Sequence, residues 1–197
     1  MIFRIALLFL ISFSSFAVNP GDTAPDFTLY NHKDNKVKLS TFKGKYIILE
    51  WFNSGCPFVK KHYESGNMQA TQSLYSSNSE VVWLTIISSA KGKQGYINNL
   101  SEAKLIIDKW KMKNDHMLFD KTGDIGQLYG AKTTPHIFII KPNFKVGYVG
   151  AIDSIASADP KDIKDSTNYV TSSISKMMLK ERPSPQKTQP YGCSVKY

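Results

Sequence analysis

Residues 46–63 read YIILEWFNSGCPFVKKHY, and this stretch decides the fold. Its first seven residues form a nearly continuous apolar run of strand length, which is typical of a central strand buried on both faces. A short polar turn follows at residues 53–55, and Pro57 suits the first turn of a helix. Cys56 therefore lies where a buried strand gives way to a helix.

The rest of the chain continues the alternation of strands and helices. We expect a β-hairpin over 27–39, strands over 80–88 and 116–119, helices over 100–110 and 125–129, a hairpin over 136–149 and a last helix over 169–179. This order indicates an α/β fold, in which helices flank a central mixed β-sheet and a β-hairpin precedes the core.

The N-terminus has the pattern of an export signal. Residues 1–17 place Arg4 before a short apolar run and end in small residues, with cleavage expected before Val18. We therefore predict a secreted or periplasmic protein that meets the membrane only through this signal. Residues 18–181 would form the domain, and residues 182–197, which are polar and rich in proline, would form an extended, mobile tail carrying Cys193.

The composition excludes several classes of protein. The chain has 197 residues, of which 42% are hydrophobic, so most of it is not disordered. Two cysteines are too few for a disulfide-rich scaffold. The formal net charge is +9, but the lysines are dispersed and match no nucleic-acid motif, so we expect a solvated basic surface and no nucleic-acid partner.

The position of Cys56 favours a reactive thiol. Free backbone N–H groups and the positive end of the helix dipole stabilise a thiolate at a helix start, and Lys60, Lys61 and His62 add nearby positive charge. The thiolate is the reactive form of cysteine, so we expect Cys56 to be ionised and accessible. The other interpretation is a small buried apolar residue that merely begins the helix.

The segment around Cys56 resembles the active-site segment of the thioredoxin-like superfamily, with Val59 at the place of the second cysteine of Cys-x-x-Cys. The loop around Thr134 and Pro135 resembles the loop whose cis-proline faces that cysteine. Residues 20–27, PGDTAPDF, are similar to the opening of the redoxin, or alkyl hydroperoxide reductase/thiol-specific antioxidant, family. Together with residues 65–68 and the ending YGCSVKY, they resemble its secreted peroxiredoxin-like subgroup. The resemblance implies a thioredoxin-like fold and thiol redox chemistry.

Two departures from the family pattern bear on the reaction. Without a cysteine at position 59, a dithiol cycle within one motif cannot run. Asn53 stands where peroxiredoxins carry Thr or Ser, and Arg182 is the only arginine after the signal. The sequence therefore leaves open whether a peroxide or a disulfide is the substrate.

The candidate site residues have alternative roles. Glu50, unusual in an apolar strand, is either a proton acceptor for the thiol or the partner of a lysine. Cys193 has three alternative roles. It is a resolving cysteine, one end of a permanent disulfide that stabilises the fold by about 5 kcal/mol, or a cysteine that forms a disulfide with another chain. A cis bond at Thr134–Pro135 would shape a substrate groove, to which we also assign Asn53 and Pro57.

We predict an extracytoplasmic thiol oxidoreductase in which Cys56 is the nucleophile, Cys193 is the resolving cysteine and Glu50 accepts the proton of the thiol. Its partners would be an external thiol reductant and a peroxide or a disulfide-bearing protein. The sequence contains no metal-ligand spacing and no nucleotide fingerprint, so we expect no metal and no cofactor. The alternatives are a non-enzymatic binding module with a structural Cys56–Cys193 disulfide and an envelope-surface role for the basic face. The oligomeric state stays open.

Overall fold

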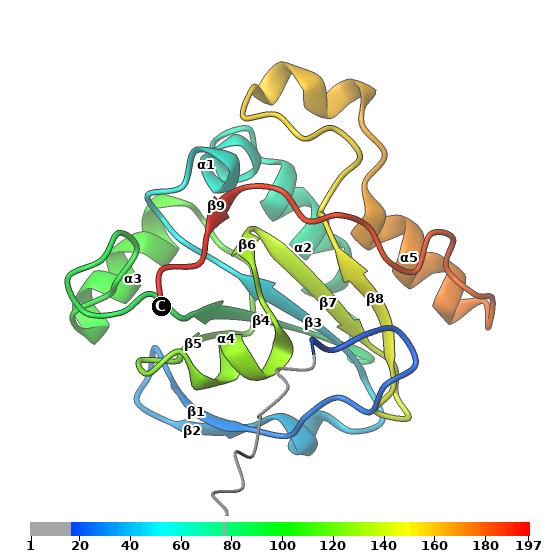
Figure 1. Ribbon diagram of the computed structural model, residues 1–197, viewed down its shortest axis with the longest axis horizontal. Helices are drawn as coiled ribbons and strands as arrows, with labels where there is room; N and C mark the ends of the chain where they lie inside the picture. The colour runs from blue at the N-terminus through cyan, green and yellow to red at the C-terminus, as the bar shows by residue number, and fades with distance from the viewer. Residues whose placement is uncertain (1–16, 77) are drawn as a thin grey trace, which may run out of the picture.

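The computed structural model describes residues 17–76 and 78–197, so the predicted signal at residues 1–17 lies almost wholly outside the described residues. Seven strands form one mixed sheet in the order β2-β1-β5-β4-β3-β7-β8. They are β1 (Thr28–Asn31), β2 (Lys36–Lys38), β3 (Tyr46–Trp51), β4 (Val81–Ile87), β5 (His116–Phe119), β7 (His136–Ile140) and β8 (Val146–Gly150). The α/β fold with a central mixed sheet and an N-terminal hairpin is confirmed (Figure 1).

The apolar run at residues 46–52 becomes the centre of this sheet. β3 pairs in parallel with β4 and antiparallel with β7, so both of its edges are hydrogen-bonded. Residues 47–51 are completely buried, because both faces of the sheet are covered. Odd-numbered residues of β3 pack into one apolar core and even-numbered ones point into the other, as the alternation of a strand requires.

Helices cover the two faces unequally. α1 (Pro57–Glu64), α2 (Asn67–Ser76), α3 (Leu100–Lys109) and α5 (Tyr169–Met178) supply side chains to one core. α4 (Asp124–Tyr129), the N-terminal segment and the short 3-10 helix Leu39–Phe42 cover the other face (Figure 1). A second 3-10 helix spans Pro160–Asp165.

One helix of the structure was not predicted from the sequence. α2 buries Met68, Thr71, Gln72 and Tyr75, which are spaced as one face of a helix. Two of these four residues are polar, and Thr71 and Gln72 are buried because they hydrogen-bond within the protein. An apolar pattern therefore does not reveal this helix.

The C-terminal segment packs onto the domain. From the end of α5 the chain runs along β8, where the N–H of Thr188 donates to the carbonyl of Val149 and the N–H of Val149 donates to the carbonyl of Gln186 (red in Figure 1). Its last strand, β9 (Cys193–Ser194), pairs antiparallel with β6 (Thr133–Thr134) in a separate two-stranded sheet. From residue 186 on, the segment lies against the domain instead of projecting from it, with backbone hydrogen bonds to Val149, Lys132 and Ala90.

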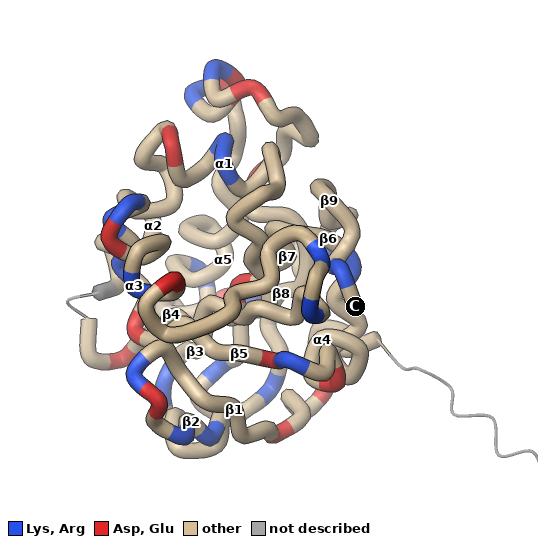
Figure 2. Tube along the Cα trace, turned by 90° about the vertical axis from the view of Figure 1, so that its left-hand side faces the viewer, with Lys and Arg blue, Asp and Glu red and all other residues tan. Residues whose placement is uncertain are grey.

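Charged residues are interspersed on the surface. On the side shown in Figure 2, basic and acidic residues alternate around β1, β2, α2 and α3. No helix in the described part of the chain combines the length and the apolar character needed to cross a bilayer.

Candidate functional site

Cys56 begins α1, at the end of the loop that follows β3. Its backbone N–H donates to the carbonyl oxygen of Asn53 at 3.1 Å. The Asn53 side chain closes the same loop, because its Oδ1 accepts from the N–H of Gly55 at 2.8 Å and its Nδ2 donates to the carbonyl of Gln94 at 3.1 Å. Asn53 is buried, so it shapes the loop before Cys56 and does not line an open groove.

The loop before β7 faces this cysteine. The Thr134–Pro135 bond is cis, as predicted. The Cys56 thiol donates to the carbonyl oxygen of Thr134 at 3.0 Å. The side-chain hydroxyl of Thr134 is buried and has no hydrogen-bond partner among the described residues. It can therefore donate to the Cys56 sulfur once that sulfur is ionised.

Cys193 reaches the same point from the end of the chain. In the β6–β9 pair it lies directly opposite Thr134, whose carbonyl oxygen accepts from the Cys56 thiol, and its side chain packs against the core cluster that contains Cys56. Both cysteines are free thiols. The backbone before Cys193 comes very close to the loop, since a Cβ on Gly192 would lie 2.1 Å from the Thr134 carbonyl oxygen. The fold therefore brings together two thiols that are 137 residues apart in the sequence.

The pKa values of the two thiols are shifted in opposite directions. Burial raises the pKa of Cys56, but hydrogen bonds from the Cys193 thiol and the Thr134 hydroxyl, with the backbone N–H groups of Cys193 and Val59, lower it further than burial raises it. Burial and the neighbouring Cys56 sulfur raise the pKa of Cys193. When the pair loses one proton, Cys56 therefore becomes the thiolate and Cys193 keeps its proton.

The expectation that Cys56 is accessible is wrong for this conformation. Its exposed fraction is 0%, whereas Cys193 is partly exposed. β9 covers Thr134 and Pro135 as well, and both are buried. Of the four residues assigned to a substrate groove, Pro57 alone is exposed, and it lines a surface pocket of about 290 Å³ with Lys60, Glu64 and Pro160.

Glu50 is held by neutral donors. Its carboxylate accepts from the hydroxyl of Tyr63 at 2.9 Å, from Nε1 of Trp83 at 2.8 Å and from the hydroxyl of Thr85 at 3.2 Å. Among the ion pairs of the described residues none includes Glu50, so the alternative of a lysine partner is not observed. Burial raises the pKa of Glu50 to about 7, although the three hydrogen bonds lower it.

The positive charge expected beside Cys56 is smaller than the sequence indicates. Lys61 is buried and pairs with Asp153 at 3.3 Å. Burial lowers the pKa of His62 to about 4, more than the nearby Asp153 raises it, so His62 is neutral at physiological pH. Asp153 and Tyr191, which meet these two side chains, have no signal in the sequence because they are far from Cys56 along the chain.

Nothing in the described residues resembles a metal centre. No group of three or more His, Cys, Asp or Glu side chains there is arranged to hold a metal ion. His136 is buried on β7 and accepts a hydrogen bond from the N–H of Lys132 at 3.2 Å.

Comparisons with known proteins give a family and a fold. The sequence model of the AhpC/TSA family matches residues 20–149. An uncharacterized conserved protein from Geobacillus kaustophilus has a similar structure, with 22% identity, a TM-score of 0.74 and 90% and 92% of the two chains covered. A hypothetical protein from Sinorhizobium meliloti 1021 is also similar, with 19% sequence identity and a TM-score of 0.75. The match covers 92% of this chain and 96% of that one.

The thioredoxin domain of a thiol-disulfide oxidoreductase from Bacteroides vulgatus is similar over a smaller part of the chain. It has 20% identity and a TM-score of 0.53, with 76% of this chain and 97% of that one covered. At these identities the likeness shows the thioredoxin-like fold. No curated protein matches the chain.

Proposed function

The chain belongs to the AhpC/TSA family, and from this and the contact between its two cysteines we propose that it is an extracytoplasmic thiol oxidoreductase. Cys56 is the nucleophile and Cys193 is the resolving cysteine. One observation carries the proposal: the pairing of β9 with β6 places Cys193 opposite Thr134, whose carbonyl oxygen accepts from the Cys56 thiol at 3.0 Å, and the pKa of that thiol is lowered. A resolving cysteine must reach the reacting sulfur, and Cys193 already lies there.

The reaction has two steps for either substrate. With a disulfide, the Cys56 thiolate attacks one sulfur, forms a mixed disulfide and releases a thiolate. Cys193, losing its proton, then attacks the Cys56 sulfur and releases the second thiolate. With a peroxide, the Cys56 thiolate attacks one oxygen, the O–O bond breaks and an alcohol or water leaves, which gives a sulfenic acid on Cys56; Cys193 then attacks the Cys56 sulfur and releases water. Two external thiols reduce the Cys56–Cys193 disulfide and complete the cycle.

Burial of Cys56 limits what can reach it. A bulky disulfide contacts Cys56 only after β9 separates from β6, and an extended substrate chain would then take the place of Cys193 and Ser194 beside Thr134 and Pro135. A peroxide is small enough to need less opening. We therefore place the substrate groove beneath the C-terminal segment.

Glu50 is suited to store the proton of this chemistry. A carboxyl whose pKa is about 7 can hold or release a proton near neutral pH. Its partner Tyr63 packs in the same core cluster as Cys56.

A census of thiols by mass spectrometry tests the function. One equivalent of peroxide or glutathione disulfide should join Cys56 to Cys193 in the wild type, and dithiothreitol should reverse the reaction. Cys56→Ser should stop turnover of both oxidants, and Cys193→Ser should leave Cys56 as a sulfenic acid or mixed disulfide. Full turnover by Cys56→Ser would exclude the proposal. A disulfide that resists mild reductant would instead support a binding module with a structural bridge.

Location has its own test. The extracytoplasmic assignment depends on removal of residues 1–17, so sequencing the N-terminus of the protein made in a bacterial host should give Val18 as the first residue. A mature protein that starts at Met1 and stays in the cytoplasm would contradict it.

A further inference from the structure

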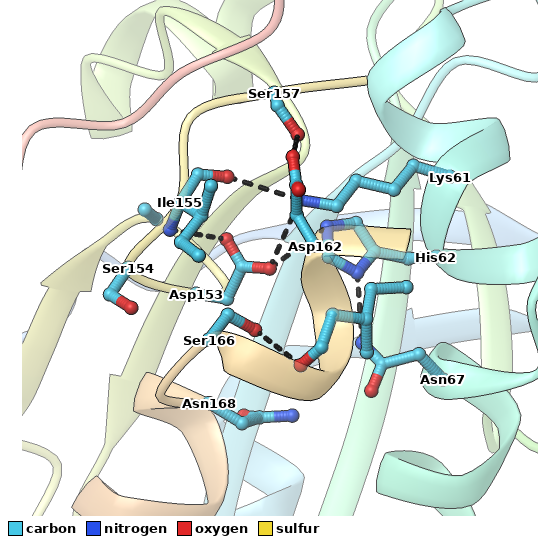
Figure 3. Close-up of polar contacts among 12 residues, drawn as sticks. Lys61, His62, Asn67, Asp153, Ser154, Ile155, Ser157, Asp162, Ser166 and Asn168 are labelled. Atoms are coloured by element: carbon cyan, nitrogen blue, oxygen red, sulfur yellow. Dashed lines mark hydrogen bonds and ion pairs between the residues drawn. The ribbon is translucent and has the colours of Figure 1, made fainter. Parts of the chain in front are cut away.

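A buried ion pair lies beside the last turn of α1. Lys61 donates from Nζ to Oδ2 of Asp153 at 3.3 Å and to the carbonyl oxygen of Ile155 at 3.0 Å. The side chains of Lys61 and Asp153 are 0% and 1% exposed. Figure 3 shows Lys61 and His62 extending from α1 toward Asp153, which follows β8. We call Lys61, His62 and Asp153 the anchor cluster.

Stability alone is a weak explanation for the anchor cluster. Taking two charges out of water is unfavourable, and buried ion pairs can often be replaced by apolar residues without loss of stability. The cluster also contains a neutral histidine close to its carboxylate, with 3.9 Å between His62 Nε2 and Asp153 Oδ2. A further side chain, from another segment, completes the anchor cluster.

That side chain is Tyr191, from the C-terminal segment. Its hydroxyl donates to Oδ1 of Asp153 and lies 3.3 Å from Nε2 of His62. The amide of Asn67 donates to Nδ1 of His62 at 2.8 Å, which assigns the ring proton to Nε2. A directed chain of hydrogen bonds therefore runs from His62 through Tyr191 to Asp153.

The ring of Tyr191 is held as well as its hydroxyl. Its centroid is 5.7 Å from Nζ of Lys61 and 5.8 Å from the centroid of Phe58, which follows Pro57 in α1. The first residues after Cys56 thus form one wall of the Tyr191 site, and the loop after β8 forms the other.

Tyr191 is two residues before Cys193. Between them Gly192 is pressed against the Thr134 carbonyl, so the segment has little room to move once the Tyr191 ring is fixed. A span of two extended residues is only about 7 Å, so the position of Tyr191 determines whether Cys193 meets Cys56.

We propose that the anchor cluster holds the C-terminal segment through Tyr191 and so keeps the Cys193 thiol in reach of Cys56. Tyr191 is a positioning residue for the exchange between the two sulfurs, and His62 and Asp153 act through it. This inference rests on the proposed function. The step concerned joins the two sulfurs, as two thiols lose two electrons and two protons to glutathione disulfide, which becomes two molecules of glutathione.

Tyr191→Phe tests the inference in the full-length protein. The variant keeps the ring contacts with Phe58 and Lys61 and removes the hydroxyl. Tyr46→Phe is the matched control, because it removes a tyrosine hydroxyl that donates to the carbonyl of Met177 in α5, away from Cys193. The equilibrium between protein dithiol and disulfide in glutathione buffers gives the effective concentration of Cys193 toward Cys56.

We expect Tyr191→Phe to lower this effective concentration about tenfold, since one hydrogen bond to a charged group is lost. The pKa of Cys56, followed by ultraviolet absorbance of the thiolate, should rise, because the Cys193 thiol no longer donates to it. Tyr46→Phe should change neither quantity. An effective concentration within twofold of the wild type in Tyr191→Phe would overturn the inference.

A second pair of variants separates the anchor from the redox function. In a Cys193→Ser background, adding Tyr191→Phe should speed alkylation of Cys56 by iodoacetamide about tenfold, because the segment that covers it is released. An unchanged rate would overturn the anchor even if the wild type forms its disulfide. If the wild type forms no internal disulfide, the proposed function fails while this measurement still decides the anchor. Should Tyr191→Phe not fold, Phe58→Leu should lower the effective concentration in the same direction.

Discussion

Cys193 and Cys56 meet at Thr134, and the partly exposed Cys193 lies over a Cys56 that is itself 0% exposed. The more acidic sulfur is therefore the inner one and the more accessible sulfur is the outer one. In an exchange reaction the more acidic thiol is the better leaving group. The pair is thus arranged so that an external thiol meets Cys193 and expels Cys56.

We predict that reduction begins at Cys193. When the Cys56–Cys193 disulfide is mixed with a bulky thiol and quenched in acid, the trapped mixed disulfide should be on Cys193 in at least about nine cases of ten. Peptide mapping of the quenched protein measures this ratio. Equal amounts on both cysteines would mean that the C-terminal segment does not shield Cys56.

Gly192→Ala should uncover Cys56. The new Cβ would lie 2.1 Å from the Thr134 carbonyl oxygen at a backbone φ of +134°, so β9 cannot stay paired with β6. We expect alkylation of Cys56 to become at least about tenfold faster in the Cys193→Ser background.

Gly44→Ala is the matched control for this change. Gly44 has a φ of +97° but nothing within 4 Å of its added Cβ, so the control carries backbone strain without a clash. Urea denaturation should show a loss of about 1–3 kcal/mol in each variant, while only Gly192→Ala changes the alkylation rate. Faster alkylation in Gly44→Ala as well would attribute the effect to general loosening of the fold.

Glu50 should make the protein less stable as the pH rises toward neutral. Burial raises its pKa from the ordinary value of 4.5 to about 7, so between these pH values the folded state binds a proton that the unfolded state has lost. Stability therefore falls with rising pH over this window. The free energy of unfolding of Glu50→Gln, relative to wild type, should increase by roughly 3 kcal/mol between pH 4.5 and pH 8. A difference that is constant with pH would contradict the assignment.

His62 should make the protein less stable as the pH falls below 6.5. Burial lowers its pKa from 6.5 to about 4, so below pH 6.5 the unfolded state binds a proton that the folded state does not. Stability falls as the pH drops from 6.5 to 4, by roughly 3 kcal/mol from this residue. His62→Gln should remove most of that slope in urea denaturation curves taken at each pH. His136, whose pKa burial lowers to about 3, keeps its own contribution in that variant.

The strand, turn and helix around Cys56 could be predicted because their signals are local. The apolar run of β3, the position of Pro57 and the helical spacing in α3 and α5 are each readable within about 18 residues. The cis bond at Thr134–Pro135 was predicted from its place before an apolar strand and from the resemblance of this loop to the cis-proline loop of the thioredoxin-like superfamily. Helix α2 was not predicted from the sequence, because its buried residues Thr71 and Gln72 are polar and hydrogen-bonded, and an apolar pattern does not detect such residues.

The environment of Glu50 could not be predicted in the same way. The sequence showed an acidic residue in a buried strand and left open a lysine partner. Its actual donors, Tyr63 and Trp83, come from α1 and β4, and their distance from Glu50 depends on how the helix packs against the sheet. The same packing removes the charge of His62, which the sequence suggested as a positive neighbour of Cys56.

The order of strands and helices and the location of one cysteine at a helix start follow from local sequence patterns, because periodicity and helix-start preferences act between near neighbours. Contacts between distant segments determine that Cys193 lies against Cys56, that Cys56 is closed to solvent, and that Tyr191 joins Asp153. β9 contains two residues, too few for a local signal, and its place is set by backbone pairing with Thr133 and Thr134 and by a side chain that fits between α1 and the loop after β8. Contacts of this kind form between parts of the chain that meet only when the core is packed.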